Sequence, residues 1–221
     1  MITPRLDMIL RNVKSSSVAD IGTDHAFVPI VLAKRGVRVI ATDVNRGPLL
    51  SAKKNIEKHG LNITLLQGFG LDVLNKDDTE EIIIAGMGGD LIKTIIKNGM
   101  EKALSSRLIL QPMNSQAELR RFLMENGFKI ESEDLAQEGR KIYNLIVAVA
   151  GNMPLSEREI DFHLPPVLYK HPLFPMLIQK KEREFKKQFT GLSKSKNGNP
   201  KELKRLENLL FAIKKLKETE L

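Results

Sequence analysis

The chain has 221 residues, an apolar fraction of 42% and a formal net charge of +8, which is room for one domain of about 150 residues and a smaller appendage. It contains no cysteine and only four scattered histidines, which excludes disulfides, thiolate metal sites and cysteine nucleophiles and argues against any bound metal. No apolar run is long enough to span a bilayer and no apolar signal segment opens the sequence, so we expect a cytoplasmic protein without a membrane partner.

Apolar runs and amphipathic segments alternate through residues 1–150, a pattern that predicts a parallel sheet covered by helices. In a parallel sheet the carboxyl ends of the strands lie at one edge, where ligands bind. The residues that follow each strand are therefore the first candidates for a functional site. The expected strands are residues 18–21, 37–43, 63–66, 82–85, 108–110, 128–135 and 143–149.

The first two expected strands end in residues typical of a nucleotide-cofactor site. Gly22, in the stretch Asp20-Ile21-Gly22-Thr23-Asp24-His25-Ala26, lets the backbone approach a ligand, and Asp43 can accept both hydroxyls of an adenosine ribose. Carboxylates at the turn would repel a pyrophosphate but not a sulfonium, so S-adenosylmethionine fits better than NAD. The alternative is that Asp20 and Asp24 are an ordinary helix cap and turn residue. His25 can bond a base or merely stabilise the loop.

The third expected strand ends in a loop with two glycines, Gly68-Phe69-Gly70. Such a loop can lie over an adenine ring and offer a backbone N–H to its edge. A loop without any ligand is the alternative.

The fourth expected strand runs into Gly86-Met87-Gly88-Gly89, which exposes backbone at the ligand-binding edge and places a polarizable side chain beside a cofactor or base. A glycine-rich turn without a ligand is the alternative. The chain lacks an Asn-Pro-Pro-Tyr or Asp-Pro-Pro-Tyr motif here, which disfavours methylation of an exocyclic amino group. Because there is no cysteine, attack at C5 of a pyrimidine is disfavoured too.

The fifth expected strand runs into Gln111-Pro112-Met113-Asn114-Ser115. Two amides beside a rigid proline at the cleft edge can read a base, since each amide offers a donor and an acceptor. Asn114 can equally cap the helix that follows.

The last two expected strands break the alternation. Only residues 136–141 separate them, too few for a crossover, so they should form an antiparallel hairpin. Five strand–helix units that end in a hairpin predict the seven-stranded α/β sheet of class I methyltransferases. A dinucleotide-binding fold would end in another parallel strand.

Prolines at 154, 165, 166 and 172 mark a boundary between a domain at 1–152 and a domain at 153–221. Two helical stretches follow, 173–192 and 200–220. The apolar spacing in the second predicts an antiparallel hairpin with a coiled-coil seam, which the second helix forms with Leu206, Leu209, Ile213 and Leu216 and the first can face with Ile178, Phe185, Phe189 and Leu192. Residues 151–221 carry 15 Lys and Arg against 9 Asp and Glu, which supplies +6 of the total charge. This surface can bind a polyanion or be an ordinary solvated face.

Taken together, these motifs resemble the bacterial tRNA (adenine(22)-N1)-methyltransferase family over essentially the whole chain. The resemblance rests on Arg5-Leu6, residues 20–26, Ala85-Gly86-Met87-Gly88-Gly89, Leu110-Gln111-Pro112 and Tyr143. It implies that Asp20, Gly22 and Asp43 hold the cofactor, that Gly86, Gly88 and Gly89 frame the methyl-transfer cleft, and that the helical hairpin engages tRNA. Phe69 departs from the pattern, because related sequences usually carry Asp or Asn between the glycines.

We therefore expect methyl transfer from S-adenosylmethionine to N1 of an adenine in tRNA, by a monomer without a metal. N1 has its own lone pair and needs no strong base. Asp24 should stabilise the developing positive charge, while His25 and Asn114 position the base and Arg5 grips phosphate or closes the cleft. The alternatives are a methyltransferase of this fold for a small molecule or protein, and a non-catalytic RNA-binding protein with a vestigial pocket. The predicted cofactor residues are Asp20, Gly22, Asp43, Gly68, Phe69, Gly70, Gly86, Met87 and Gly88, and the predicted substrate residues are Arg5, Gly89, Gln111 and Pro112.

Overall fold

The computed structural model describes residues 2–195 and 198–219. The chain divides into two compact units, Met1–Leu155 and Ser156–Leu221, each described below by itself. The independent folding of a domain at 1–152 and another at 153–221 stays a prediction.

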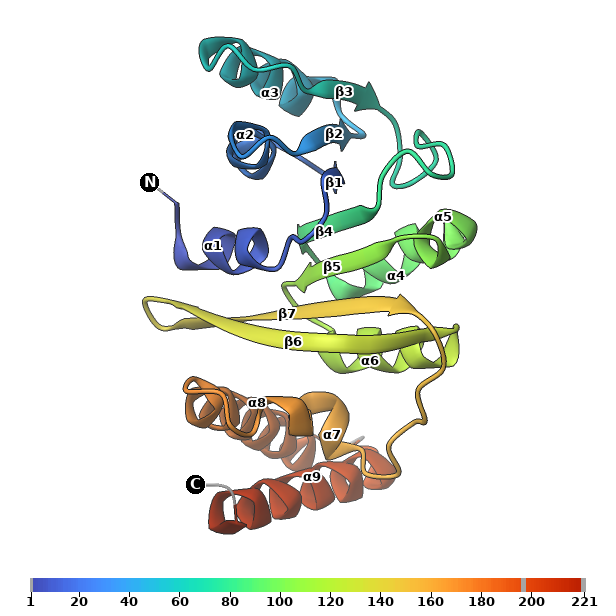
Figure 1. Ribbon diagram of the computed structural model, residues 1–221. Coiled ribbons are helices and arrows are strands. Elements are labelled where there is room, and N and C mark those ends of the chain that lie inside the picture. Colours follow the sequence, from blue (N-terminus) through green and yellow to red (C-terminus); the bar gives the residue numbers. More distant parts are fainter. Residues whose placement is uncertain (1, 196–197, 220–221) are drawn as a thin grey trace. The chain divides into compact units, whose positions relative to one another are not determined.

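The first unit is built on a seven-stranded sheet in the order β3-β2-β1-β4-β5-β7-β6. The five strands from β3 to β5 are parallel, and β7 pairs antiparallel with both β5 and β6 (Figure 1). This arrangement confirms the predicted sheet and its terminal hairpin. The strands are β1 (Ser17–Ile21), β2 (Arg38–Asp43), β3 (Thr64–Gln67), β4 (Glu81–Met87), β5 (Arg107–Pro112), β6 (Phe128–Glu138) and β7 (Lys141–Ala150).

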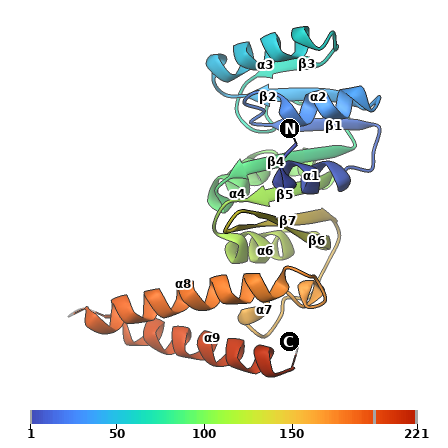
Figure 2. The same cartoon turned by 90° about the vertical axis from the view of Figure 1, so that its left-hand side faces the viewer.

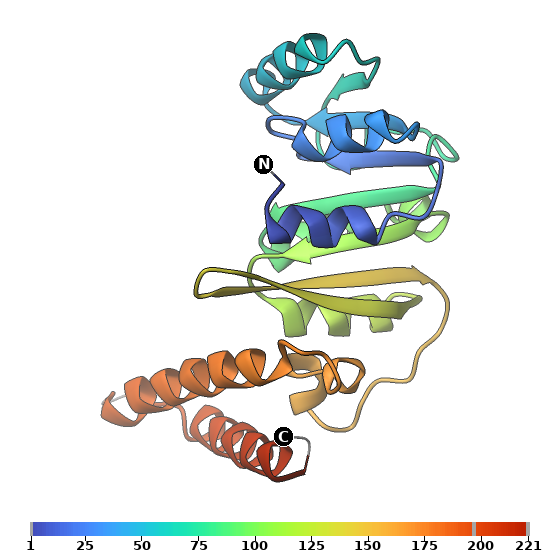
Figure 3. The ribbon, with the colours of Figure 1, turned by 60° about the vertical axis from the view of Figure 1, so that its left-hand side comes forward.

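Helices cover both faces of this sheet. One face carries α1 (Pro4–Arg11), α2 (Phe27–Lys34) and α3 (Arg46–Lys58), which Figure 3 shows side by side, and the other carries α4 (Gly89–Asn98), α5 (Met100–Leu104) and α6 (Gln116–Glu125). Each face of the sheet has its own hydrophobic core, and successive residues of a strand point alternately into one core and the other. Val18 of β1 belongs to the core under α1, and the next residue, Ala19, belongs to the core under α4. Buried on both faces, the strands read as continuous apolar runs.

Three details differ from the expectation. Residues 68–80, between β3 and β4, form turns instead of a helix, so the third strand–helix unit is incomplete. The connection in the hairpin is only the turn Gly139-Arg140, because pairing continues to Glu138 and Lys141, and Gly139 takes the positive φ of 56° that so tight a turn favours. The short helix α1 had no periodic signal long enough to predict it.

Ion pairs attach α1 and its following loop to the sheet. Glu81, almost fully buried at the start of β4, accepts from Arg107 Nη1 at 2.6 Å and from the Lys14 N–H at 3.1 Å. Arg11 donates from Nε and Nη2 to both oxygens of Asp134 on β6, each at 2.9 Å. Because α1 also contacts β6 and β7, the helix is fixed beside the hairpin.

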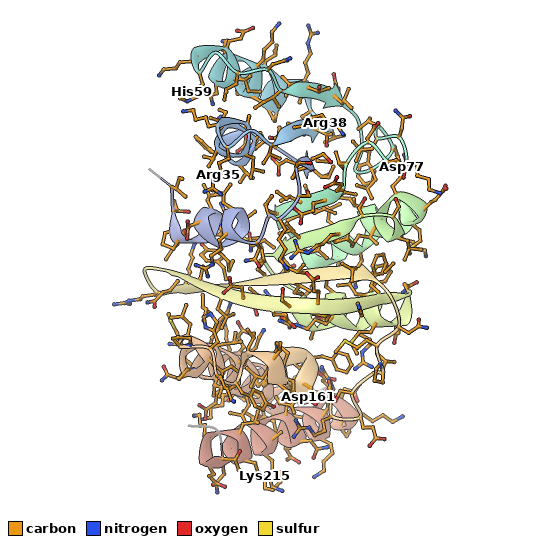
Figure 4. The ribbon with its side chains drawn as sticks, in the orientation of Figure 1. Arg35, Arg38, His59, Asp77, Asp161 and Lys215 are labelled. Carbon is orange, nitrogen blue, oxygen red and sulfur yellow. The ribbon has the colours of Figure 1, made fainter. Side chains whose placement is uncertain are left out.

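The connection between β3 and β4 is also held against the sheet. Arg38, at the start of β2, donates to the backbone carbonyl of Asp78 in the β3–β4 connection, and Figure 4 labels Arg38 and the neighbouring Asp77. This contact anchors a segment that has no helix of its own.

The second unit contains α7 (Ile160–His163), η1 (Pro166–Leu168), α8 (Phe174–Lys194) and α9 (Pro200–Thr219). The long helices α8 and α9 pack together in opposite directions, which confirms the predicted helical hairpin (Figure 2). The predicted seam is buried in α9 at Leu206, Leu209, Ile213 and Leu216 and in α8 at Ile178 and Phe185. Phe189 and Leu192, predicted to face it, are half-buried. Glu220, which the sequence assigned to the second helix, lies outside the described residues. Within the described ranges, no helix has the length and apolar character needed to cross a membrane.

Candidate active site

The carboxyl ends of the parallel strands in the first unit open onto a cavity of about 580 Å3. It lies where the strand order changes direction, between β1 and β4, which is where sheets of this kind bind ligands. The predicted site residues that line it are Arg5, Asp20, Gly22, Asp24, His25, Asp43, Gly68, Phe69, Gly70, Gly86 and Met87. Those outside its lining are Gly88, Gly89, Gln111, Pro112 and Asn114.

Asp20, near the end of β1, is a buried carboxylate at the cavity wall, only 6% exposed. Burial, with the negative charge of Asp43 as a weaker contribution, raises the pKa of Asp20 to about 6. The two carboxylates repel one another, and a cation bound between or beside them would relieve this repulsion. This pair therefore favours a positively charged ligand.

The turn after β1 has an unusual backbone. Asp24 and Ala26 have positive φ angles of 48° and 57°, each of which costs a non-glycine residue about 1 kcal/mol or more. Several hydrogen bonds support the turn: the Gly22 and Thr23 N–H groups donate to the Thr42 carbonyl of β2 at 2.9 and 2.8 Å, and Asn55 Nδ2 of α3 donates to the His25 carbonyl at 3.0 Å. As a result Asp24 and His25 line the cavity with exposed side chains, and Asp24 Oδ1 lies 3.7 Å from His25 Nε2.

Position 22 needs a glycine for a second reason besides access of a ligand to the backbone, because a side chain there would clash with Met87. Its φ is +77°, and a Cβ there would lie 2.2 Å from the Met87 Cε. Met87 thus reaches across the turn from the end of β4 and forms part of the cavity wall.

Asp43 ends β2 at the same wall, where its Oδ1 accepts from the Asn45 N–H at 2.9 Å. The backbone carbonyl of Asp43 accepts from the Gly68 N–H at 3.0 Å, which brings the Gly68-Phe69-Gly70 loop beside it. Since the Gly68 N–H is engaged, a backbone donor to an adenine edge has to come from Phe69 or Gly70. The Phe69 ring is 36% exposed and borders the cavity.

Gln111 differs from the expected base-reading amide because it is fully buried and bonds inward. Its Oε1 accepts from Arg5 Nη1 at 3.1 Å and from the Gly86 N–H at 3.2 Å, while its Nε2 donates to the Pro112 carbonyl at 3.3 Å. As placed, Gln111 holds Arg5 against the end of β4 and offers nothing to a base. Pro112 is buried as well.

The other residues outside the cavity form a tight junction between α4 and the loop after β5. A Cβ on Gly89 would lie 2.6 Å from the Ser115 carbonyl oxygen, and the Gly89 N–H donates to Asn114 Oδ1 at 3.2 Å. Asn114 therefore caps the start of α4, not the helix that follows it, and a Cβ on Gly88 would lie 3.0 Å from the same oxygen. This junction positions Met113 at the cavity rim.

The sequence reasoning did not identify several residues of the wall. Glu138 at the tip of β6 carried no local signal, and Tyr143 of β7 entered only through a family resemblance. Both residues contact the predicted residue Arg5. Its backbone N–H donates to Glu138 Oε1 at 2.9 Å, and its guanidinium carbon lies 5.8 Å from the centre of the Tyr143 ring. The remaining unanticipated wall residues are Leu6, Ile9, Ile21, Thr23, Phe27, Val28, Thr42, Val44, Asn45, Ala85, Leu91, Ile95 and Met113.

The cavity is acidic. Four carboxylates line it, those of Asp20, Asp24, Asp43 and Glu138, against the single guanidinium of Arg5. The Thr3 hydroxyl and the Arg5 N–H bond to Glu138 and hold the pKa of this carboxyl below its ordinary value. Among the described residues, no group of three histidine, aspartate or glutamate side chains is placed to hold a metal ion. The excess of carboxylates suits a bound cation.

Comparisons with known proteins agree with this geometry. Residues 2–146 match the family described as "Methyltransferase domain". The chain is 39% identical over 157 residues to the tRNA (adenine(22)-N(1))-methyltransferase of Bacillus subtilis, a match that spans 68% of this chain and 66% of that protein, just under two thirds of its length.

Two solved structures are similar over almost their whole length. Sp1610 of Streptococcus pneumoniae, a candidate tRNA (m1A22) methyltransferase in complex with S-adenosyl-L-methionine, is 36% identical with a TM-score of 0.84, and the match covers 98% of this chain and 99% of that one. The M. capricolum protein TrmK, in complex with S-adenosyl-homocysteine, is 26% identical with a TM-score of 0.83, and the match covers 100% of both chains.

Proposed function

Because this chain belongs to the bacterial tRNA (adenine(22)-N1)-methyltransferase family of class I methyltransferases, we propose that it transfers the methyl group of S-adenosylmethionine to N1 of adenine 22 in tRNA. The acidic cavity at the strand ends carries this proposal, because its charge favours a sulfonium and disfavours a pyrophosphate. We place the enzyme in the cytoplasm. We take a monomer as the working unit.

The residues around the cavity fit S-adenosylmethionine. We assign Asp43 to the ribose hydroxyls, the 68–70 loop to the adenine ring and Asp20 to the charged methionine end, and the position of all three in the cavity lining supports this assignment. The buried Thr42 hydroxyl, which has no hydrogen-bond partner within the described chain, leaves a further polar atom at this wall. Phe69 can stack on the ring and leave the polar bonds to backbone.

When bound, this cofactor supplies a methyl group made electrophilic by its sulfonium. The N1 lone pair of the acceptor adenine forms the new bond to the methyl carbon, while the C–S electron pair stays on sulfur. The chain therefore has to exclude water, aim N1 along the C–S axis and tolerate the positive charge that remains on the base. Asp24 is the exposed carboxylate of the strained turn, and we assign it to the last task, with His25 beside it.

Replacing Asp24 by alanine should slow methyl transfer at least tenfold, because a carboxylate that stabilises charge in the transition state would be lost. Cofactor affinity should stay within about threefold, since Asp20 and Asp43 remain. Single-turnover transfer and calorimetry with S-adenosylmethionine measure the two effects. An unchanged single-turnover rate would remove Asp24 from the mechanism.

The direct test incubates the protein with unmodified tRNA and labelled S-adenosylmethionine and then maps the labelled nucleoside. We expect label at N1 of adenine 22, and a tRNA with guanine at that position serves as the control. Label on a protein or small molecule instead would indicate a different acceptor. Failure to bind the cofactor at millimolar concentration would indicate a non-catalytic RNA-binding protein.

A further inference from the structure

The cavity has two walls that differ in chemistry. The strand ends β1, β2 and β3 supply the acidic side that suits the cofactor, with Asp20 and Asp43. The opposite side, called here the acceptor wall, consists of Arg5, Leu6 and Ile9 of α1 together with Glu138 and Tyr143 of the β6–β7 hairpin. Nothing in the cofactor assignment uses the acceptor wall.

The acceptor wall is held rigidly from three directions. Arg5 donates its backbone N–H to Glu138 at 2.9 Å and its Nη1 to the fully buried Gln111 at 3.1 Å. Its guanidinium carbon lies 5.8 Å from the Tyr143 ring centre. Gln111 also accepts from the Gly86 N–H, so the wall is connected to the end of β4, where the two sides of the cavity meet. Such preorganisation is typical of a binding subsite.

These groups match an unstacked adenine. A tyrosine ring with apolar neighbours provides a surface on which a base can stack, and base–aromatic stacking contributes about 1–3 kcal/mol. A carboxylate accepts hydrogen bonds only, and with four lone-pair sites Glu138 can bond the Thr3 hydroxyl and the Arg5 N–H and still accept from an amino group. Adenine offers an exocyclic amino group next to N1, whereas guanine presents a carbonyl oxygen there, which a carboxylate repels.

Charge determines how much of a nucleotide can enter. Four carboxylates against one guanidinium repel phosphate but accept a base, and they favour the cation that N1 methylation produces. Basic side chains lie outside the cavity lining at the hairpin turn, where Arg140 and Lys141 are exposed. An extruded base can therefore enter while its phosphates stay near the rim.

We propose that the acceptor wall is the subsite for the target adenine, with the Tyr143 ring as its stacking surface and the Glu138 carboxylate as the acceptor for its exocyclic amino group. This rests on the proposed function and adds the residues that select adenine. Glu138 and Tyr143 touch the base, and Arg5 and Gln111 position them.

The test is a cycle of one protein change and one substrate change. The Glu138→Gln variant and the wild type each receive tRNA with adenine at position 22 or with purine, which lacks the amino group. With wild type, purine should lower kcat/KM about 10- to 100-fold, and with adenine Glu138→Gln should lower it similarly. The two losses should not add, because both act on one contact: the glutamine amide is neutral and has one acceptor oxygen, which the Arg5 N–H can occupy. Purine is intrinsically less reactive than adenine, but this difference affects the wild type and the variant equally and therefore cancels when their ratios of kcat/KM are compared.

A matched control comes from the neighbouring strand position. Gln137 is exposed and adjacent in β6, so its side chain points to the opposite face of the hairpin. Gln137→Glu should leave the adenine preference unchanged. For Tyr143, the phenylalanine variant should keep most of the activity and the leucine variant should raise KM for tRNA at least tenfold. Thermal melting and S-adenosylmethionine affinity, unchanged in each variant, show that the fold and the cofactor side are intact.

The outcomes separate the two proposals. If wild type puts no methyl on adenine N1, the proposed function and this subsite both fail. If wild type methylates adenine N1 but the losses from Glu138→Gln and purine multiply, or Glu138→Gln has no effect, the function stands and the subsite is wrong. Non-additive losses together with a Tyr143→Leu defect support it.

Discussion

Asp20 lowers the stability of the cofactor-free protein at neutral pH. The carboxylate is buried beside Asp43, so its pKa is about 6 instead of 3.8. A folded-state pKa above the unfolded value means that stability is full below about pH 4 and falls as the pH rises through 6. At neutral pH the ionised group lowers the free energy of unfolding by on the order of 3 kcal/mol in the cofactor-free protein. A bound cation offsets this cost, which couples cofactor affinity to stability.

Asp20→Asn should therefore stabilise the cofactor-free protein at pH 7.5, by up to about 3 kcal/mol, and leave it unchanged at pH 4. Thermal denaturation of both proteins at the two pH values measures this difference. The same variant should bind S-adenosylmethionine at least tenfold more weakly at pH 7.5.

The pH dependence of binding provides the control for Asp20. Wild-type affinity for S-adenosylmethionine should weaken as the pH falls below 6, because protons compete with the cation, and the asparagine variant should lack this step. Parallel pH profiles for the two proteins would mean that Asp20 does not carry the charge effect.

At the residue scale, sequence reasoning located the groups that follow strands and missed those brought in by tertiary contact. Asp20, Gly22 and Asp43 lie at strand ends, where residue type and spacing have a known purpose. Glu138 meets Arg5 across 133 residues of sequence, and no local pattern predicts such a contact. Gln111 was assigned to the substrate because its amide lies at a strand end, yet that amide is buried against Arg5 and Gly86.

At the scale of elements, the β4–α4 turn and the loop after β5 act as one structural piece. Gly89 begins α4, and its backbone touches the backbone of residues 114 and 115 too closely for any side chain. The glycine at this position is thus explained by backbone packing, and the loop in turn fixes Met113 at the cavity rim.

Gly89→Ala should lower the free energy of unfolding by about 1–3 kcal/mol, because a Cβ 2.6 Å from a carbonyl oxygen forces the loop to move. Denaturant titration gives the change. The control is Gly47→Ala in α3, where a Cβ would meet nothing within 4 Å and should be neutral or stabilising by up to about 1 kcal/mol. Equal effects at both glycines would exclude backbone packing as the cause.

Helices and strands could be predicted from the sequence where the hydrophobic pattern was long enough to recognise. Alternating apolar runs located the strands of the sheet, and the heptad-like spacing of Leu206, Leu209, Ile213 and Leu216 located the seam of α9. The short helices α1 and α7 were missed, since four to eight residues carry too little periodicity. Tertiary contacts hold α1 in place, through Arg11 and the loop that bonds to Glu81.

At the scale of the whole molecule, charge is divided unevenly along the chain. Residues 151–221 carry +6 of the +8, while the cavity in the first unit is acidic. An acidic site cannot by itself attract a polyanion, so the tRNA affinity that we propose has to come from basic surfaces elsewhere. The α8–α9 hairpin is the largest such surface by composition, and Lys215 of α9 is labelled in Figure 4.

Replacing four exposed lysines of α8 and α9 by glutamine should weaken tRNA binding and reduce its salt dependence. The slope of log affinity against log salt should fall by roughly one for each phosphate that a lysine no longer neutralises. Binding titrations between low and moderate salt measure this slope. The positions are Lys187, Lys194, Lys201 and Lys214.

The matched control replaces four exposed lysines of α3 and α4, which should leave the slope nearly unchanged: Lys53, Lys54, Lys58 and Lys97. If both sets change the slope equally, the helical hairpin has no special part in holding RNA.

The bond from Arg5 to Glu138 also sets an order of assembly during synthesis. A nascent chain that has reached β4 already contains Asp20, Asp43 and the 68–70 loop, but the partner of Arg5 is still untranslated. Until the β6–β7 hairpin emerges from the ribosome, the first turn of α1 lacks its contacts with Glu138 and Tyr143. An unfinished chain therefore contains the residues proposed for the cofactor before those proposed for the base, and we expect a product that ends before the hairpin to lack methyl transfer.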